Sequence, residues 1–286
     1  MPSVTDIRRR IKSVENTAKI TKAMSMIAAS KMRRAQEMAL EGRPYSQRLR
    51  ALLSNLAAQN TDEEFLHPLL TKRPAKNTTV VLITPDRGLT GGLHSKINRT
   101  AGQFLVSQTG EKQLITIGRK GRDFMIRTGQ NVKAEFTAIG DKPSVSDISP
   151  TAKIVIDDYT NGLTDAVHIV YADFVSTTLQ KPIIQSLLPI IPADLNAQDA
   201  VGYIYEPSNQ EVLASLLPRF VELELYHAVL ESMASEHSAR MVAMRNATDN
   251  ADEMVLDLTL QMNKARQETI TKELLDIVGG AAAVGN

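Results

Sequence analysis

The chain of 286 residues contains no cysteine and no tryptophan, and aromatic side chains make up only 4% of it. The lack of cysteine excludes a disulfide scaffold, a thiolate zinc site and a cysteine nucleophile. No apolar run reaches the ~18 residues that a membrane-spanning helix needs. The first residues also lack the apolar core of a signal peptide, so we expect a soluble chain from a reducing or redox-indifferent compartment.

The net charge is only +1, but charge is distributed unevenly along the chain. Residues 1–50 hold 12 Lys and Arg against 4 Asp and Glu, whereas residues 210–286 hold 6 against 12. The net charges of the first, middle and last blocks are therefore +8, −1 and −6. The basic block is able to bind nucleic acid or anionic lipid, or to pair with the acidic end of the same chain.

Residues 1–60 are predicted to form one long helix. Ser3 and Asp6 make a capping-box pattern at its start, and Gly42 and Pro44 are expected to weaken or kink it. Apolar or small residues recur at alternating spacings of three and four, which is a heptad seam. This N-terminal seam consists of Val4, Ile7, Ile11, Val14, Ala18, Thr21, Ser25, Ala28, Met32, Ala35 and Ala39.

Residues 208–286 are predicted to form a second, longer helix. Ser208 and Glu211 repeat the capping pattern, and Pro218 is expected to break or kink the helix after about ten residues. The C-terminal seam consists of Leu223, Tyr226, Leu230, Met233, His237, Met241, Met244, Thr248, Ala251, Val255, Leu258, Met262, Ala265 and Thr269. Two successive spacings of four around His237 are a stutter, which locally unwinds a supercoil.

The two seams have similar lengths and opposite charge, so we predict an antiparallel coiled coil of the two ends of the chain. Between Ala18 and Ala39 the N-terminal seam is mostly Ala, Thr and Ser. These small residues bury far less apolar area than Leu, which contributes ~1.5–3 kcal/mol when buried. A second, partial stripe of Ile20, Met24 and Ile27 lies beside the seam. We infer that another protein surrounds this weak stretch.

Residues 77–205 alternate strand-like and helix-like segments, which predicts a Rossmann-like α/β domain with a mainly parallel sheet. Strands are expected at 79–84, 113–117, 134–138 and 165–174, with 181–191 added antiparallel. Helices are expected at 93–106, from 118 onward and at 145–161. The overall fold class is thus α/β (α+β), with the coiled coil of the two ends attached to this central domain.

Two loops resemble anion sites without matching a known fingerprint. The turn at residues 88–92 follows a strand and precedes a helix, where phosphate loops occur, but it lacks both GxGxxG and GxxxxGK[ST]. We favour a structural turn there over a nucleotide site. The basic segment 118–122 is more consistent with a solvated loop than with an anion site. The five histidines show no metal-binding spacing.

Five segments resemble the gamma subunit of F-type ATP synthase. They are residues 19–32 (KITKAMSMIAASKM), 84–93 (TPDRGLTGGL), 203–207 (YIYEP), 235–251 (SEHSARMVAMRNATDNA) and 263–274 (NKARQETITKEL). The resemblance spans the whole chain. It implies a non-catalytic central-stalk rotor, without cofactor or metal, inside a hexamer of alpha and beta subunits. The epsilon subunit and the membrane c-ring are the other implied partners, at the cytoplasmic face of a bacterial plasma membrane.

The resemblance also implies roles for particular residues. Lys22 and Met24 match the coupling region that faces an acidic loop of the beta subunit, and Arg87 matches a turn near the lower edge of the hexamer. The C-terminal coupling and catch region is matched by Arg240, Gln267, Thr271 and Glu273. The foot on the c-ring is matched by Tyr203, Tyr205 and Glu206. Each residue also has a plainer interpretation as seam packing or as part of a solvated helix face.

Two other function classes compete with the rotor. The alternative is a coiled-coil nucleic-acid binder that uses the basic residues 8–34. These residues lack the interleaved aromatics of a stacking surface, and their charge is better explained by pairing with the acidic end of the chain or with an acidic partner. A phosphate-binding enzyme at residues 88–92 is the third hypothesis.

Overall fold

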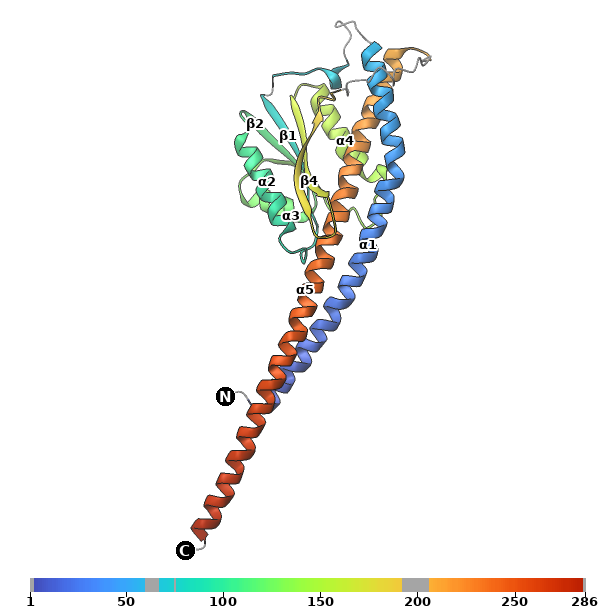
Figure 1. Ribbon diagram of the computed structural model, residues 1–286. Helices are drawn as coiled ribbons and strands as arrows, with labels where there is room; N and C mark the ends of the chain where they lie inside the picture. Colours follow the sequence, from blue (N-terminus) through green and yellow to red (C-terminus); the bar gives the residue numbers. More distant parts are fainter. Residues whose placement is uncertain (1–2, 60–66, 75, 192–205, 285–286) are drawn as a thin grey trace. The chain divides into compact units, whose positions relative to one another are not determined.

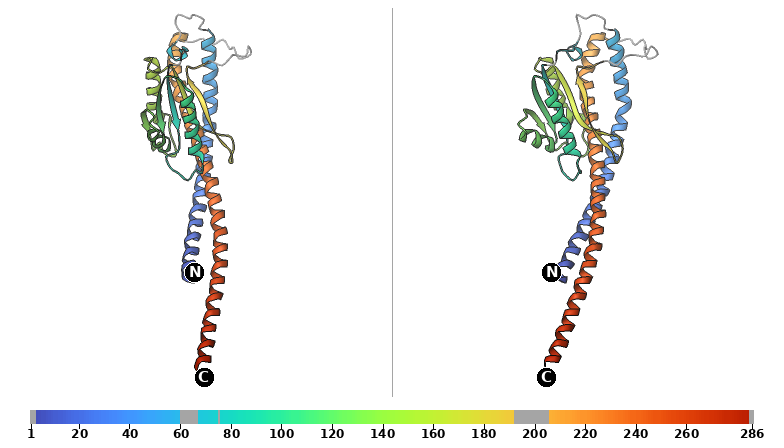
Figure 2. Two further views of the ribbon diagram at one scale, coloured as in Figure 1. Left: turned by 90° about the vertical axis from the view of Figure 1, so that its left-hand side faces the viewer. Right: turned by 60° about the vertical axis from the view of Figure 1, so that its left-hand side comes forward.

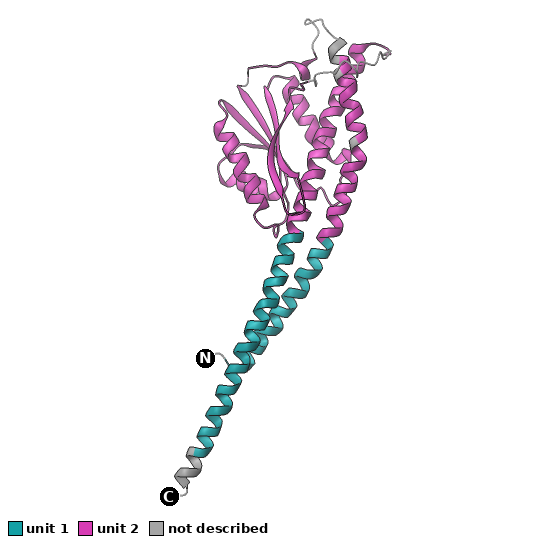
Figure 3. Cartoon of the chain, viewed as in Figure 1, with its two compact units in different colours: residues 1–27, 241–286 teal, residues 28–240 magenta. Residues whose placement is uncertain are grey.

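The computed structural model describes residues 3–59, 67–74, 76–191 and 206–284. The chain divides into two compact units, one of residues 1–27 and 241–286 and the other of residues 28–240 (Figure 3). Helices α1 (Val4–Gln59) and α5 (Asn209–Val284) each contribute to both units. Within each unit the two helices run side by side in all three views (Figures 1 and 2).

Both long helices begin where the capping patterns predict. The amide of Asp6 donates to Ser3 Oγ at 3.2 Å, and the amide of Glu211 donates to Ser208 Oγ at 3.2 Å. The helix α5 continues through Pro218, so the predicted break is wrong. Leu213 and Leu217, which precede Pro218 in the helix, are buried, and their packing offsets the hydrogen bond that proline cannot make. Pro44 likewise lies inside an uninterrupted α1.

In the first unit, residues 4–27 of α1 pack against α5 through the two seams. Thr21 Oγ1 lies 2.7 Å from Thr248 Oγ1, and Ser25 Oγ donates to the carbonyl of Met241 at 3.2 Å. These contacts run in opposite directions along the two helices, which confirms the antiparallel pairing. Ala18 is buried at the same seam, as predicted.

The outer surfaces of this helix pair carry large apolar side chains. Ile20 and Ile27 are 60% and 56% exposed, so the second stripe of α1 faces away from α5. The side chains of residues 266–278 of α5 are all exposed. None of the helices in the described part of the chain combines the length and apolar character that a bilayer crossing requires.

The second unit contains a five-stranded sheet in the order β3-β2-β1-β4-β5. The first four strands are parallel and β5 is antiparallel to β4, as predicted. The strands are β1 (Asn77–Ile83), β2 (Glu111–Ile117), β3 (Val132–Phe136), β4 (Ala166–Phe174) and β5 (Gln180–Leu188). The shorter helices are η2 (Pro68–Leu70), α2 (Leu93–Ser107), α3 (Arg119–Arg127) and α4 (Val145–Thr160).

Alternate residues of β1 point to opposite faces of the sheet, and each face has its own core. Val80 and Leu82 pack with α2 and α3, whereas Val81 and Ile83 pack with α4, α1 and α5 (Figure 1). Because the sheet is covered on both faces, its central strand is a continuous apolar run rather than an alternating one. The parts of α1 and α5 that belong to this unit therefore form, with α4, one covering layer of the sheet.

Candidate functional site: the sheet edge that holds the helix pair

The carboxyl edge of the parallel strands is where open α/β folds place their ligands, in the crevice at which the strand order reverses. In this sheet the reversal lies between β1 and β4, because the chain proceeds from β1 to one side and later returns to the other. The loops that leave these strands are residues 84–92 and 175–179. A ligand-binding protein of this class would bind its ligand between them.

Here α5 of the same chain contacts both loops. Ser238 Oγ donates to the carbonyl of Thr177 at 2.8 Å, and Arg240 Nη2 donates to the carbonyl of Gly88 at 3.3 Å. Ser238 is fully buried. The position that α/β proteins commonly use for a small molecule thus anchors a helix of the second unit, which favours the structural interpretation of the turn at residues 88–92.

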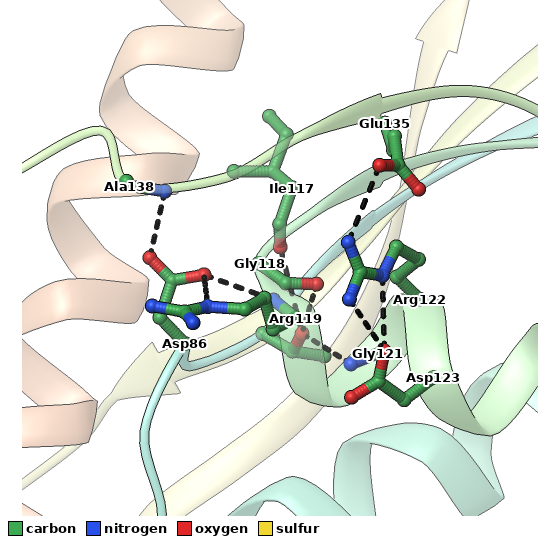
Figure 4. Close-up of polar contacts among 10 residues, drawn as sticks. Asp86, Ile117, Gly118, Arg119, Gly121, Arg122, Asp123, Glu135 and Ala138 are labelled. Atoms are coloured by element: carbon green, nitrogen blue, oxygen red, sulfur yellow. Dashed lines mark hydrogen bonds and ion pairs between the residues drawn. The ribbon is translucent and has the colours of Figure 1, made fainter.

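Residues 118–122 are the N-cap and first turn of α3 rather than the expected solvated loop, and their amides are committed to the same edge (Figure 4). Arg119 N donates to Asp86 Oδ1 at 2.9 Å, and Gly121 N donates to Thr84 Oγ1 at 2.7 Å. A Cβ on Gly118, whose φ is +101°, would lie 1.8 Å from the Thr84 carbonyl oxygen, so only glycine fits there. The first amides of α3 bind protein groups, so they do not form an anion site.

The carboxylate of Asp86 connects three loops. Its Oδ1 accepts from the Arg119 amide, and its Oδ2 accepts from the Ala138 amide at 2.9 Å (Figure 4). The loop of Ala138 continues to Asp141, which pairs with Lys31 of α1 at 2.7 Å. The edge therefore contacts both long helices, α5 through Arg240 and α1 through Lys31.

Buried charge accumulates on α5 beside this edge. Arg240 Nη2 lies 2.7 Å from Glu236 Oε1, and its Nη1 lies 3.3 Å from His237 Nδ1. Burial raises the pKa of Glu236 above its usual range, with Asp86 and Asp141 adding to the effect. Burial, assisted by the nearby Arg240 and Lys31 cations, lowers the pKa of His237 to about 4.

The pKa of another acid at this site, Asp141, is shifted in the opposite direction from that of Glu236. The hydrogen bond from Lys31 lowers the pKa of the Asp141 carboxyl, and the Lys31, His237 and Arg87 charges lower it further. Near neutral pH His237 is therefore neutral, and it lies near the Arg240–Glu236 and Lys31–Asp141 pairs. The side chains of this cluster fix one another in position, so the cluster serves to attach the two long helices to the sheet edge.

A second cluster of polar side chains lies between α1, β5 and α5. The buried carboxylate of Glu224 accepts from Arg50 at 2.6 Å and from Gln185 Nε2 at 2.9 Å. Two cavities of about 200 and 290 Å³ share these three residues. The described residues contain no group of three side chains suited to a metal ion.

The residues predicted from the resemblance are divided between the two units. Lys22 is exposed and Met24 half-buried in the first unit, where Gln267, Thr271 and Glu273 are exposed on α5.

In the second unit Arg87 is exposed on the turn that the half-buried Arg240 binds. Glu206 is exposed, and Tyr203 and Tyr205 lie outside the described residues.

Sequence reasoning did not single out Asp86, Asp141, Glu236 or His237 as members of one site. Asp86 and the two α5 residues lie inside the quoted segments 84–93 and 235–251, but nothing in one sequence connects positions about 150 residues apart. The strand order was the missing information, because it brings these loops to one edge.

Comparisons with known proteins agree along the whole chain. A family model described as ATP synthase matches residues 3–284. The ATP synthase gamma chain of Dehalococcoides mccartyi is 54% identical over 284 residues, which cover 99% of this chain and 100% of the relative. That of Roseiflexus castenholzii is 51% identical over 288 residues, with 99% of both chains covered.

Solved structures share the fold. A chain of the Euglena gracilis mitochondrial ATP synthase, in a structure of OSCP, F1 and c-ring, has a TM-score of 0.69 at 20% identity, covering 98% of this chain and 94% of its own. A chain of the Tetrahymena thermophila mitochondrial ATP synthase central stalk and c-ring has a TM-score of 0.62 at 24% identity, covering 80% of this chain and 99% of its own.

Proposed function

This chain belongs to the family of ATP synthase gamma chains, and we propose that it is the central-stalk rotor subunit of a proton-translocating ATP synthase. In this role it transmits torque between a membrane c-ring and a catalytic hexamer of alpha and beta subunits. The observation that carries the proposal is the relationship to gamma chains over the full length, at 54% identity.

The surface of the first unit supports a place inside another protein. From Ala18 to Ser25 its α1 seam consists of small residues, while Ile20 and Ile27 of α1 and Leu260 of α5 are more than half exposed. Exposed apolar side chains in rows along a helix usually mark an interaction surface. A surrounding hexamer would cover these side chains and stabilise a helix pair whose own seam buries little area.

The rotor acts without making or breaking bonds. An asymmetric shaft contacts the three catalytic beta subunits differently, and contacts that differ between conformations bias the equilibrium at each nucleotide site. Rotation passes each site through different affinities in turn. We therefore propose that the chain is a non-catalytic subunit that needs no cofactor of its own.

We assign the torque contacts to residues on both helices. Lys22 and Met24 on α1 would face an acidic loop of the beta subunit, which suits the exposed ammonium of Lys22. The other contacts would come from Arg87, Arg240, Gln267, Thr271 and Glu273. At the other end, Tyr203, Tyr205 and Glu206 would form the foot on the c-ring beside the epsilon subunit, at the cytoplasmic face of a bacterial plasma membrane.

The alternative of a nucleic-acid binder receives no support from the family match. The basic helix α1 also buries its apolar seam against α5 rather than standing free. The charge excess is better explained by acidic partners, including the other end of the same chain.

Co-expression with the alpha and beta subunits of the same organism tests the proposal. We expect one copy of the chain to co-purify with a hexamer that hydrolyses ATP, and the complex without this chain to be much less active. An ATPase hexamer that assembles fully and never retains the chain would contradict the proposed function.

A further inference from the structure

A continuous set of polar contacts connects α5 to α1 through the sheet edge. It begins at Arg240 of α5, which binds the carbonyl of Gly88. Two residues earlier in the same turn, Asp86 binds the amide of Ala138, and three residues later Asp141 pairs with Lys31 of α1. All of these residues belong to the second unit, and Lys31 and Arg240 lie close to the two ends of that unit in the sequence.

Asp86 is the connection that this set of contacts cannot replace. Each of its two carboxylate oxygens accepts a backbone N–H at 2.9 Å, one from Arg119 and one from Ala138. A carboxylate accepts at both oxygens, whereas the amide of asparagine has only one oxygen. Asp86→Asn would therefore preserve the shape of the side chain and turn one hydrogen bond into an N–H facing an N–H.

Glu236 and His237 fix the direction of the Arg240 side chain. A guanidinium can only donate, so His237 Nδ1, at 3.3 Å from Arg240 Nη1, must accept and the ring proton must be on Nε2. Glu236 accepts from Nη2, the same nitrogen that reaches Gly88. The guanidinium plane is held by two residues of its own helix while it binds the turn.

The backbone beside these contacts has unusual conformations. Leu89, next to Gly88, has a φ of +63°, and Ala138 has a φ of +60°. Residues other than glycine remain in this region only where their surroundings determine the conformation. Arg240 and Asp86 are the groups that bind these two places, which indicates that the contacts hold the loops in a defined position.

We propose that Asp86 is a positioning residue for torque transmission: together with Arg240 and the Lys31–Asp141 pair, it fixes both long helices to the α/β domain. The inference rests on the proposed rotor function. Torque that enters through the α/β domain would pass to the helices through these contacts, and loosening them would let the helices turn or slip without moving the domain. Coupling would fall while ATP hydrolysis by the hexamer continues.

The test measures ATP-driven proton pumping and ATP hydrolysis in the same reconstituted complex. For Asp86→Asn we expect hydrolysis near the wild-type rate and a pumping-to-hydrolysis ratio about fivefold lower, the factor that corresponds to the net contribution of one hydrogen bond. Asp123→Asn is the matched control, because the Asp123 carboxylate is 55% exposed and bonds to the side chain of Arg122. Its ratio should equal that of wild type.

A charge reversal separates positioning from general stability. Asp141→Lys should lower the ratio, and the double change Lys31→Asp with Asp141→Lys should restore it, because the pair is re-formed in the opposite sense. Asp141 is 60% exposed, so these variants should fold even if Asp86→Asn does not.

Wild-type ratios in an assembled Asp86→Asn complex, or a double reversal no better coupled than the single change, would overturn the inference and leave the rotor function standing. A wild-type chain that does not assemble at all would instead overturn the proposed function.

Discussion

Single residues of α5 show how a buried charge can be used for position rather than for chemistry. Arg240 has three partners, and its side chain is only 13% exposed. Buried ion pairs contribute little net stability, but removal of one partner is costly because it leaves the other charge unpaired. The arrangement is therefore sensitive to substitution, although none of its members needs to react.

The protonation of His237 gives a prediction at this scale. Its pKa is about 4 in the folded chain and near 6.5 when unfolded. Between these values the unfolded state binds a proton that the folded state does not, so stability falls as the pH is lowered from 6.5 to 4. The full effect of the shift is about 3 kcal/mol in the free energy of unfolding.

The variant His237→Gln isolates this contribution, because glutamine can still accept from Arg240 and does not titrate. Chemical unfolding at pH 4.5 and pH 7 should show a smaller loss of stability in the variant than in wild type. Glu236 acts in the opposite direction, since its raised pKa makes the folded state bind more protons. Because Glu236 is present in both proteins, its contribution cancels in the comparison. Equal losses of stability in wild type and His237→Gln would contradict the lowered pKa of His237.

At the scale of the helices and strands, the sequence predicts most of the fold. The expected strands differ from β1–β5 by a few residues at their ends, because apolar runs and turn residues mark them directly. Both seams can be recognised in the sequence, because apolar residues that alternate at spacings of three and four over many turns indicate a helix packed along one stripe. The predicted break at Pro218 is wrong, because the local cost of proline is visible in the sequence and the burial of the leucines that offsets it is not.

The candidate site is harder to predict from the sequence than the helices and strands are. Resemblance drew attention to Arg240 and to the turn of Arg87, but their relationship through Gly88 depends on the order of the strands. The hydrogen bonds of Asp86 connect three segments that come together only after the sheet has formed. Long-range pairing of this kind leaves no periodic pattern in a single sequence.

The exposed stripe of α1 gives the prediction at this scale. Met24 is half-buried between the exposed Ile20 and Ile27, and Met and Lys have similar helix propensity. The variant Met24→Lys should therefore fold and assemble, and its added charge should lower the ratio of proton pumping to ATP hydrolysis.

The control for this variant is Val106→Lys, a similar change on α2, where the side chain is 84% exposed. Its ratio should remain near the wild-type value. A Met24→Lys complex that pumps as many protons per ATP as wild type would contradict the role that we assign to Met24.

At the scale of the whole chain, the absence of cysteine, the low aromatic content and the separation of charge have a common explanation. A rotor needs contact surfaces and stiffness rather than reactive groups. The +8 of the first 50 residues and the −6 of the last 77 favour pairing of the two ends. The remaining positive charge can face acidic loops of a surrounding hexamer, where charge complementarity guides association more than it adds affinity.

Rotation itself tests the central claim most directly. Because the chain contains no cysteine, the substitution Val106→Cys provides a single attachment point for a bead on the α/β domain, while the alpha and beta subunits are fixed to a surface. Addition of ATP should turn the bead continuously in one direction. A complex that contains this chain and hydrolyses ATP at the full rate while the bead stays still would contradict the account.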